Sequence, residues 1–230
     1  MITLYQFEIS PFCDKVRRIL HYKGLAFEVR EVSMAETVTE LKRRNPAGKV
    51  PFIEYDDAVV ADSTEIARFL EEKHRTPPLF PSSPRERALC HLLEDWADES
   101  LYFYEVRLRF TFPNNAKRWI PILTARENAV VRSAAAMIVP SHMKKILANQ
   151  GLGRKTDAAV LEDVRRHTHA IATWLGEAQW LVGDALSIAD IAVFAQMHCI
   201  RGTDEGGPIV SDNRVVAAWM DRVDQATTRR

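Results

Sequence analysis

Four prolines within residues 75–84 constrain the fold of this chain more than any other feature of its sequence. Proline lacks the backbone N–H that helix interiors and central strands need, so such a cluster is typical of a boundary between domains. Short β-rich and helical segments alternate before it, and only helical patterns follow it. We therefore expect an α/β domain at residues 1–75, a linker at 76–84 and an all-helical domain at 85–230.

The first 75 residues predict the element order β-α-β-α-β-β-α, which is the thioredoxin-like arrangement. In the first helix, Phe12, Val16, Ile19 and Leu20 recur at helical spacing, and we expect the basic residues 15, 17 and 18 to face away from the core. The expected strands are 2–7, 26–32, 51–55 and 58–61, and the expected helices are 10–24, 35–44 and 63–73.

The second part predicts helices only, at 84–111, 117–149, 156–177, 187–200 and 211–227. Pro140 is a candidate break in the second of these helices. Ser187 and Asp190 form a capping box, and we expect each side chain to contribute on the order of 1 kcal/mol of stability and no chemistry. No role is assigned to the segment 201–210.

The net charge and the number and spacing of the cysteines narrow the classes of function that we expect for this chain. Lys plus Arg and Asp plus Glu both number 31, so there is no net charge to attract nucleic acid or an anionic membrane. No apolar run approaches the roughly 18 residues of a membrane span, and the first five residues predict a strand rather than a leader peptide. Three widely spaced cysteines argue against a disulfide framework and a zinc site, and favour the cytoplasm.

The turn Ser10-Pro11-Phe12-Cys13 lies between a strand and a helix. Unpaired N–H groups at a helix N-terminus stabilise a thiolate, and a cysteine there can have a lowered pKa. A serine there can instead donate a hydrogen bond to the thiolate of a ligand. The alternative is that Ser10 is only an N-cap and Pro11 only a favourable first helical residue, and these four residues alone favour that alternative.

Two further motifs have both a structural and a functional interpretation. Val50-Pro51 begins a strand; its peptide bond is expected to be trans on frequency alone, whereas a cis bond would turn the Val50 backbone towards a peptide ligand. Asp62 and Glu65 fit a helix-capping pattern, and the same helix N-terminus with Ser63 could bind a carboxylate. Without context, capping alone is favoured at Asp62.

Other candidate groups are interpreted structurally. Cys90 and Cys199 are expected to be buried small hydrophobic residues, and His167 and His169 to face solvent without forming a metal site. The aromatic residues between 102 and 119 predict core, with some of them lining a hydrophobic pocket.

Taken together, these motifs resemble a cytosolic glutathione transferase, of the serine type or of a related bacterial-like branch, over essentially the whole chain. The resemblance is carried by Ser10-Pro11-Phe12-Cys13, Asn45-Pro46, Lys49-Val50-Pro51, Asp62-Ser63 and the segment 186–191, together with the proline-rich linker and the helical second half. It implies a thioredoxin-like N-terminal domain, an all-α C-terminal domain and a cis bond before Pro51.

The resemblance implies glutathione as co-substrate, without a metal. Ser63 would bind its γ-glutamyl carboxylate, with Asp62 near the amino group, the Val50 backbone along the cysteinyl portion and Lys49 near the glycyl carboxylate. Ser10 would donate to the sulfur and favour thiolate, the nucleophilic form. Tyr104, Arg107 and Trp119 are candidates for the electrophile pocket.

The sequence departs from the family's pattern at three positions. Asp62 stands where many relatives have Glu, and Tyr5 lies too early in the chain for the thiol-activating tyrosine of other branches. Cys13 occupies the fourth position of a turn whose first position holds the nucleophilic cysteine of glutaredoxin-like relatives, so Ser10 is preferred as the working residue.

Three functions follow as hypotheses. The first is a detoxifying, homodimeric transferase that conjugates glutathione to small hydrophobic electrophiles. The second is a glutathione-dependent thiol–disulfide oxidoreductase that uses Cys13, and the third is a glutathione-binding or regulatory protein without turnover.

Overall fold

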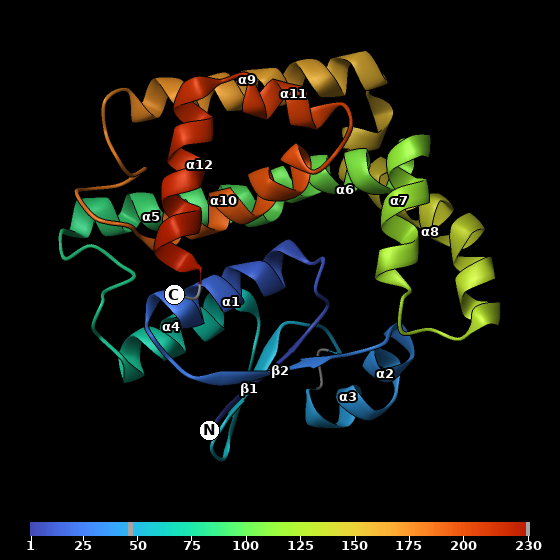
Figure 1. Cartoon of the computed structure of the whole chain (residues 1–230), viewed down its shortest axis with the longest axis horizontal. Coiled ribbons are helices and arrows are strands. Elements are labelled where there is room, and N and C mark those ends of the chain that lie inside the picture. The colour runs from blue at the N-terminus through green and yellow to red at the C-terminus, as the bar shows by residue number, and fades with distance from the viewer. Residues whose placement is uncertain (46–47, 229–230) are drawn as a thin grey trace.

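A mixed four-stranded sheet forms one end of the molecule, and a cluster of helices forms the other (Figure 1). The structure is a computed structural model that describes residues 1–45 and 48–228. The strand order is β2-β1-β3-β4, with β1 parallel to β2 and antiparallel to β3. The strands are β1 (Ile2–Gln6), β2 (Phe27–Glu31), β3 (Phe52–Tyr55) and β4 (Ala58–Ala61).

Both faces of this sheet are covered by helices, as in a thioredoxin-like domain. On one face α1 and α4 pack together over the buried side chains of Leu4 and Ile53. On the other face Leu41 of α3 packs with Tyr5 and Phe52. The helices of this part are α1 (Pro11–Tyr22), α2 (Met34–Val38), α3 (Glu40–Arg44) and α4 (Ser63–Lys73).

The rest of the described chain contains helices and no strand, as the sequence predicts. Helix α10 lies at the centre of this part, and nearly all of its side chains are buried. The elements are α5 (Pro84–Trp96), the π-helical turn η1 (Ala97–Leu101), α6 (Tyr102–Thr111), α7 (Pro113–Leu123), α8 (Ala129–Gln150), the 3-10 turn η2 (Leu152–Arg154), α9 (Asp157–Leu175), α10 (Ile188–Arg201), α11 (Gly206–Ser211) and α12 (Arg214–Thr227).

Several predicted helix limits differ from the structure. Helix α8 continues through Pro140, and the break lies at residues 124–128, where Asn128 caps α8 by accepting from the Val131 N–H. The predicted helix 35–44 is two short helices, because Thr39 has a non-helical backbone and its hydroxyl bonds the Ala35 carbonyl. The predicted helix 84–111 contains a π turn, and the unassigned segment 201–210 contains the start of α11.

Helix α1 is buried on two sides, so the prediction that its basic residues face away from the core is wrong for Lys15 and Arg18. Helices α10 and α12 pack on the side of α1 opposite the sheet. Lys15 and Arg18 are therefore only 1% and 9% exposed. Arg18 pairs with Asp14 and Asp224, so burial does not leave its charge uncompensated.

The proline-rich segment connects the two parts without regular structure, between the end of α4 at Lys73 and the start of α5 at Pro84. We retain 1–75, 76–84 and 85–230 as the proposed domain limits. Among the described residues, no helix is long and apolar enough to cross a membrane.

Candidate functional site

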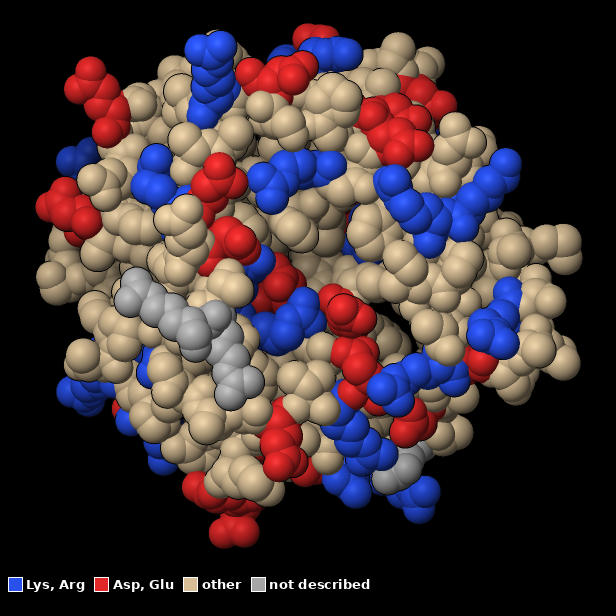
Figure 2. All heavy atoms as spheres, viewed as in Figure 1, with Lys and Arg blue, Asp and Glu red and all other residues tan. Residues whose placement is uncertain are grey.

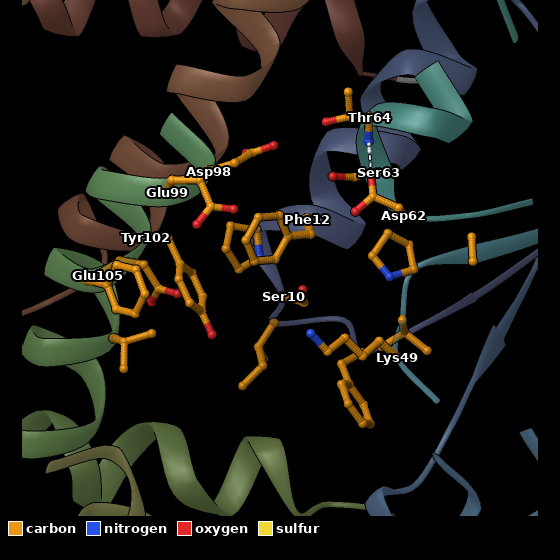
Figure 3. A pocket seen from close by; sticks show the side chains of 18 of the residues that line it. Ser10, Phe12, Lys49, Asp62, Ser63, Thr64, Asp98, Glu99, Tyr102 and Glu105 are labelled. Carbon is orange, nitrogen blue, oxygen red and sulfur yellow. Dashed lines mark hydrogen bonds between the residues drawn. The ribbon is translucent and has the colours of Figure 1, made fainter. Parts of the chain in front are cut away.

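A cavity of about 1360 Å³ lies between the sheet-containing part and the helical part. One wall consists of the turn before α1, the segment before β3 and the start of α4; the other consists of α5, the π turn and α6. Figure 2 shows the hollow on this face, with acidic and basic side chains around its margin. Figure 3 shows Ser10, Lys49 and Asp62 lying across the cavity from Asp98, Glu99 and Tyr102.

Ser10 lies at the N-terminus of α1 and lines the cavity. Its backbone is extended, its N–H donates to the Phe7 carbonyl at 3.0 Å, and its hydroxyl oxygen accepts from the Cys13 N–H at 3.4 Å. Pro11 takes the first helical position, where its missing N–H has no consequence. Accepting a hydrogen bond uses a lone pair of the hydroxyl and leaves its O–H as a donor, so the capping and donor roles of Ser10 are compatible.

Cys13 is fully buried and is not among the residues that line the cavity. Burial raises the pKa of the Cys13 thiol to about 11, although the hydrogen bond with Ser10 acts in the opposite direction. The thiol is therefore protonated at neutral pH and shielded from a ligand in the cavity. This geometry is unfavourable for a nucleophilic cysteine, which needs both exposure and a lowered pKa.

The segment before β3 brings backbone that is not paired in the sheet to the cavity. The antiparallel pairing of β3 ends at Phe52, so the backbone of Val50 lies beyond the last paired residue. The Val50–Pro51 peptide is cis. The Asn45 side chain donates to the Lys49 carbonyl at 2.8 Å and ties this segment to the end of α3. Lys49, Val50 and Pro51 all line the cavity, whereas Pro46 of the motif Asn45-Pro46 lies outside the described residues.

Asp62 and Ser63 stand at the start of α4. Asp62 has φ 76°, a conformation that is rare for residues other than glycine. Its carboxylate accepts from the N–H groups of Thr64 and Glu65, at 2.9 and 3.2 Å, so the predicted cap is present. Ser63 is 4% exposed and lines the cavity beside it. The helix N-terminus and the hydroxyl together form a site that suits a carboxylate.

A buried ionic cluster, which sequence reasoning missed, supports this wall. The Lys15 ammonium lies 2.7 Å from both Glu94 and Asp98, and 3.2 Å from the Thr64 hydroxyl. Glu94 and Asp98 come from α5 and the π turn, so the cluster joins the helical part to α1 and α4. Burial raises the pKa of Asp98, an effect that Lys15 opposes. The only signal in the sequence was the acidic run at residues 94–99.

On the opposite wall, α6 carries aromatic side chains, whereas α5 and the π turn contribute carboxylates such as Asp98 and Glu99. The rings of Phe12 and Tyr102 lie 4.9 Å apart, and Phe103 and Phe110 continue this surface. Burial raises the pKa of Tyr102 to about 12, so its phenol is neutral at physiological pH. At the far end, Glu127 of the loop between α7 and α8 accepts from the Met34 N–H at 2.6 Å, which connects this loop to α2 (Figure 1).

Three pocket candidates proposed from sequence were wrong, because none of them lines the cavity. Tyr104 donates to Asp163, Arg107 pairs with Asp157, and Trp119 packs under the Arg109 guanidinium. His167 is half-buried against Trp96 and Tyr104 rather than facing solvent. Cys90 and Cys199 are buried, as predicted, and no group of three or more possible metal ligands occurs in the part of the chain that the structure describes.

Residues 4–78 match the family described as glutathione S-transferase, N-terminal domain, and residues 134–225 match glutathione S-transferase, C-terminal domain. The chain belongs to the glutathione S-transferase family, whose co-substrate is glutathione. The predicted thioredoxin-like domain followed by a helical domain is thereby confirmed.

Curated relatives match this chain over different shares of their length, from 41% to 98% in the three examples that follow. The isoprene-epoxide–glutathione S-transferase of Rhodococcus sp. (strain AD45) is 24% identical over 97% of this chain and 98% of that protein. Glutathione S-transferase 1 of Dianthus caryophyllus is 43% identical, over 38% of this chain and 41% of that protein. FtsZ-localized protein A of Caulobacter vibrioides is 26% identical over 86% of this chain and 76% of that protein.

Solved structures have the same fold. A glutathione S-transferase from Rhodospirillum rubrum F11 superposes with a TM-score of 0.70, at 24% identity, over 97% of this chain and 88% of that one.

Proposed function

We propose that this protein conjugates glutathione to small hydrophobic electrophiles, with Ser10 donating a hydrogen bond to the glutathione sulfur. The observation that carries the proposal is the position of Ser10 on the cavity, between the start of α4, which suits a carboxylate, and the aromatic side chains of α6. A donor at the sulfur favours thiolate over thiol, and the thiolate attacks the electrophile.

Each predicted ligand contact has a donor or acceptor of suitable chemistry. The hydroxyl and backbone N–H of Ser63, at the start of α4, would hold the γ-glutamyl carboxylate, with the Asp62 carboxylate near the amino group. The unpaired backbone of Val50 would bond the cysteinyl portion as an added strand does. Lys49 extends into the cavity towards Ser10 (Figure 3) and would meet the glycyl carboxylate.

The aromatic side chains at the cavity support the choice of electrophile. Phe12, Tyr102, Phe103 and Phe110 face the space beside Ser10, and such surfaces hold apolar and aromatic molecules. Attack on an aryl halide transfers the sulfur to the ring carbon and releases halide. The proton that the thiol loses passes to solvent, so no oxidant or reductant is needed.

Two alternatives remain as outcomes of the test. The oxidoreductase that uses Cys13 is disfavoured by the burial and raised pKa of this thiol. The second alternative is a glutathione-binding protein without turnover, which the relatives support because they include proteins not named as transferases, such as FtsZ-localized protein A.

We also propose that the protein works in the cytoplasm as a homodimer. Its three cysteines are unpaired, as a reducing compartment favours.

The test measures turnover of glutathione with 1-chloro-2,4-dinitrobenzene and, separately, glutathione binding by calorimetry. Removing one hydrogen-bond donor to a developing anion costs about 10²–10³-fold in rate, so we expect a loss of this order in kcat/KM for Ser10→Ala. Ser63→Ala should raise KM for glutathione, and Cys13→Ala should retain activity. Binding without turnover in the wild type would favour the non-catalytic alternative, and loss of thiol–disulfide exchange in Cys13→Ala would favour the oxidoreductase.

A further inference from the structure

The carbonyl of Ile9, the residue directly before Ser10, is held by a side chain from the helical part of the protein. Arg109 of α6 donates from Nη2 to this oxygen at 2.9 Å. Among the described residues, a second side-chain contact to a carbonyl near Ser10 comes from within the first part, where Arg17 of α1 donates to the Glu8 carbonyl at 3.1 Å. Arg109 is thus a direct link from the second part of the chain to the backbone that carries Ser10.

Arg109 is fixed in place on several sides. Its side chain is buried, and Nη1 donates to Glu105 at 3.0 Å, one helical turn earlier on α6. The guanidinium also lies 4.2 Å from the centre of the Trp119 ring, within the range of a cation–π contact. A planar group that is paired and stacked in this way has little freedom to move. Its hydrogen bond therefore holds the Ile9 carbonyl at a defined point.

A buried ion pair of this kind is a poor source of stability, because the cost of removing both charges from water offsets their attraction. The pair also forms part of the cavity wall, since Glu105 and Arg109 both line it. Figure 3 shows Glu105 beside Tyr102, on the wall across the cavity from Ser10. A buried pair beside the aromatic side chains of α6, with one hydrogen bond to the backbone just before Ser10, is better explained by what it positions than by the stability it adds.

We propose that Arg109, held by Glu105, is a positioning residue that fixes the Ile9 carbonyl and, through it, the direction of the Ser10 hydroxyl. The inference rests on the proposed role of Ser10. Hydrogen bonds weaken steeply with misalignment, so a small rotation of the Ile9–Ser10 peptide weakens the bond from Ser10 to the sulfur. Substitution in the helical part would then change the acidity of a thiol bound to the other part.

The sharpest test removes the pair without leaving a lone buried charge. The double variant Glu105→Leu/Arg109→Met replaces the two charged side chains with apolar ones of similar length, an exchange that is often neutral for folding. We expect a urea unfolding midpoint close to wild type. The pKa of the bound glutathione thiol, titrated by thiolate absorbance, should rise by about one unit, and kcat should fall about tenfold. KM for glutathione should change less than kcat.

Arg118→Met is the matched control. Arg118 also lies over the Trp119 ring, at 5.7 Å, but it donates to the Gly202 carbonyl and pairs with Asp204, away from the turn. For Arg118→Met, the pKa of the bound glutathione thiol and kcat should equal those of wild type. Arg109→Lys, which keeps a cation but loses the planar fork, should give an intermediate thiol pKa.

The inference is overturned if the double variant is folded and has the thiol pKa and kcat of wild type. It is also overturned if the double variant unfolds while Arg109→Lys is folded and keeps the wild-type thiol pKa. Failure of the proposed function gives a different result: in that case Ser10→Ala leaves the pKa of the bound glutathione thiol unchanged. A raised thiol pKa in Ser10→Ala, with no change in the double variant, rejects only the positioning role.

Discussion

Lys15 of α1 lies 2.7 Å from Glu94 of α5, and both side chains are almost completely buried. The contact joins the helix that begins at the candidate site to the first helix of the second part. Because Asp98 lies at the same distance from the same ammonium, Lys15 balances two carboxylates. The wall of the cavity at the start of α4 therefore depends on one buried lysine.

Lys15→Met should be strongly destabilising. Removing one partner of a buried pair leaves an uncompensated charge, which costs about 3–5 kcal/mol in the free energy of unfolding. Urea unfolding near neutral pH measures the loss. The control is Arg165→Met, which removes an exposed partner of Glu162 and should change stability by about 0.5 kcal/mol or less. Equal effects from the two variants would contradict the importance of the buried cluster.

Asp190→Ala should cost more than the loss of a helix cap. The carboxylate accepts from the N–H groups of Ser187 and Leu181, at 3.0 and 2.8 Å, and from the Trp219 indole at 2.9 Å. It thus connects α10, the loop before it and α12. Each buried donor left without a partner costs about 1–3 kcal/mol, so the total should reach about 3 kcal/mol.

Asp157→Ala supplies the comparison for Asp190. Asp157 also lies in the first turn of a helix, α9, but its side chain is largely exposed and pairs with Arg107. The change should cost less than about 1 kcal/mol by the same unfolding measurement. A cost at Asp190 no greater than this would show that the buried network adds nothing beyond capping.

Cys13 should make the protein less stable at alkaline pH. Burial raises the pKa of the thiol from 9.0 to about 11 in the folded protein. The unfolded chain therefore loses this proton first, and stability falls as pH rises from about 9 through about 11, by on the order of 2 kcal/mol. Because Cys13→Ala removes this contribution, its deficit against wild type should shrink between about pH 7.5 and about pH 10.5. A deficit that stays constant with pH would contradict the burial of the thiol.

Features that depend on a few neighbouring residues were predictable from the sequence. The turn at Ser10-Pro11, the cap at Asp62 and the network between Ser187 and Asp190 each rest on residues within three or four positions of each other. Such patterns reflect the need to satisfy the first N–H groups of a helix, and that need is the same in every fold. The proline-rich segment was predictable for a similar reason, because proline lacks an N–H wherever it occurs.

Features that depend on distant partners were not predictable in this way. Lys15 was expected to face away from the core because its helix shows one apolar face. The two carboxylates that pair with its ammonium lie about 80 residues later in the chain. The cost of burying a lysine is offset only by partners whose position depends on the whole fold. The sequence of α1 alone therefore carries no sign of its second buried side.

The cavity wall shows a second limit of prediction from the sequence. Tyr104 and Arg107 were assigned to the pocket, whereas the structure places Tyr102 and Phe103 there. The π turn at Ala97–Leu101 interrupts the regular helix just before these residues and changes which side chains face the cavity. Sequence periodicity assumes a continuous helix, so it cannot locate the residues of α6 relative to Ser10.

The most direct test of the account is the pKa of the glutathione thiol when it is bound to the protein. Ultraviolet absorbance of the thiolate, recorded against pH at saturating protein, measures this pKa for wild type, Ser10→Ala, Ser10→Thr and Cys13→Ala. We predict a value about one unit or more below the 8.5 or so of a free thiol for wild type, Ser10→Thr and Cys13→Ala, and a return to about 8.5 in Ser10→Ala. An unchanged pKa in Ser10→Ala would contradict the central role of this serine.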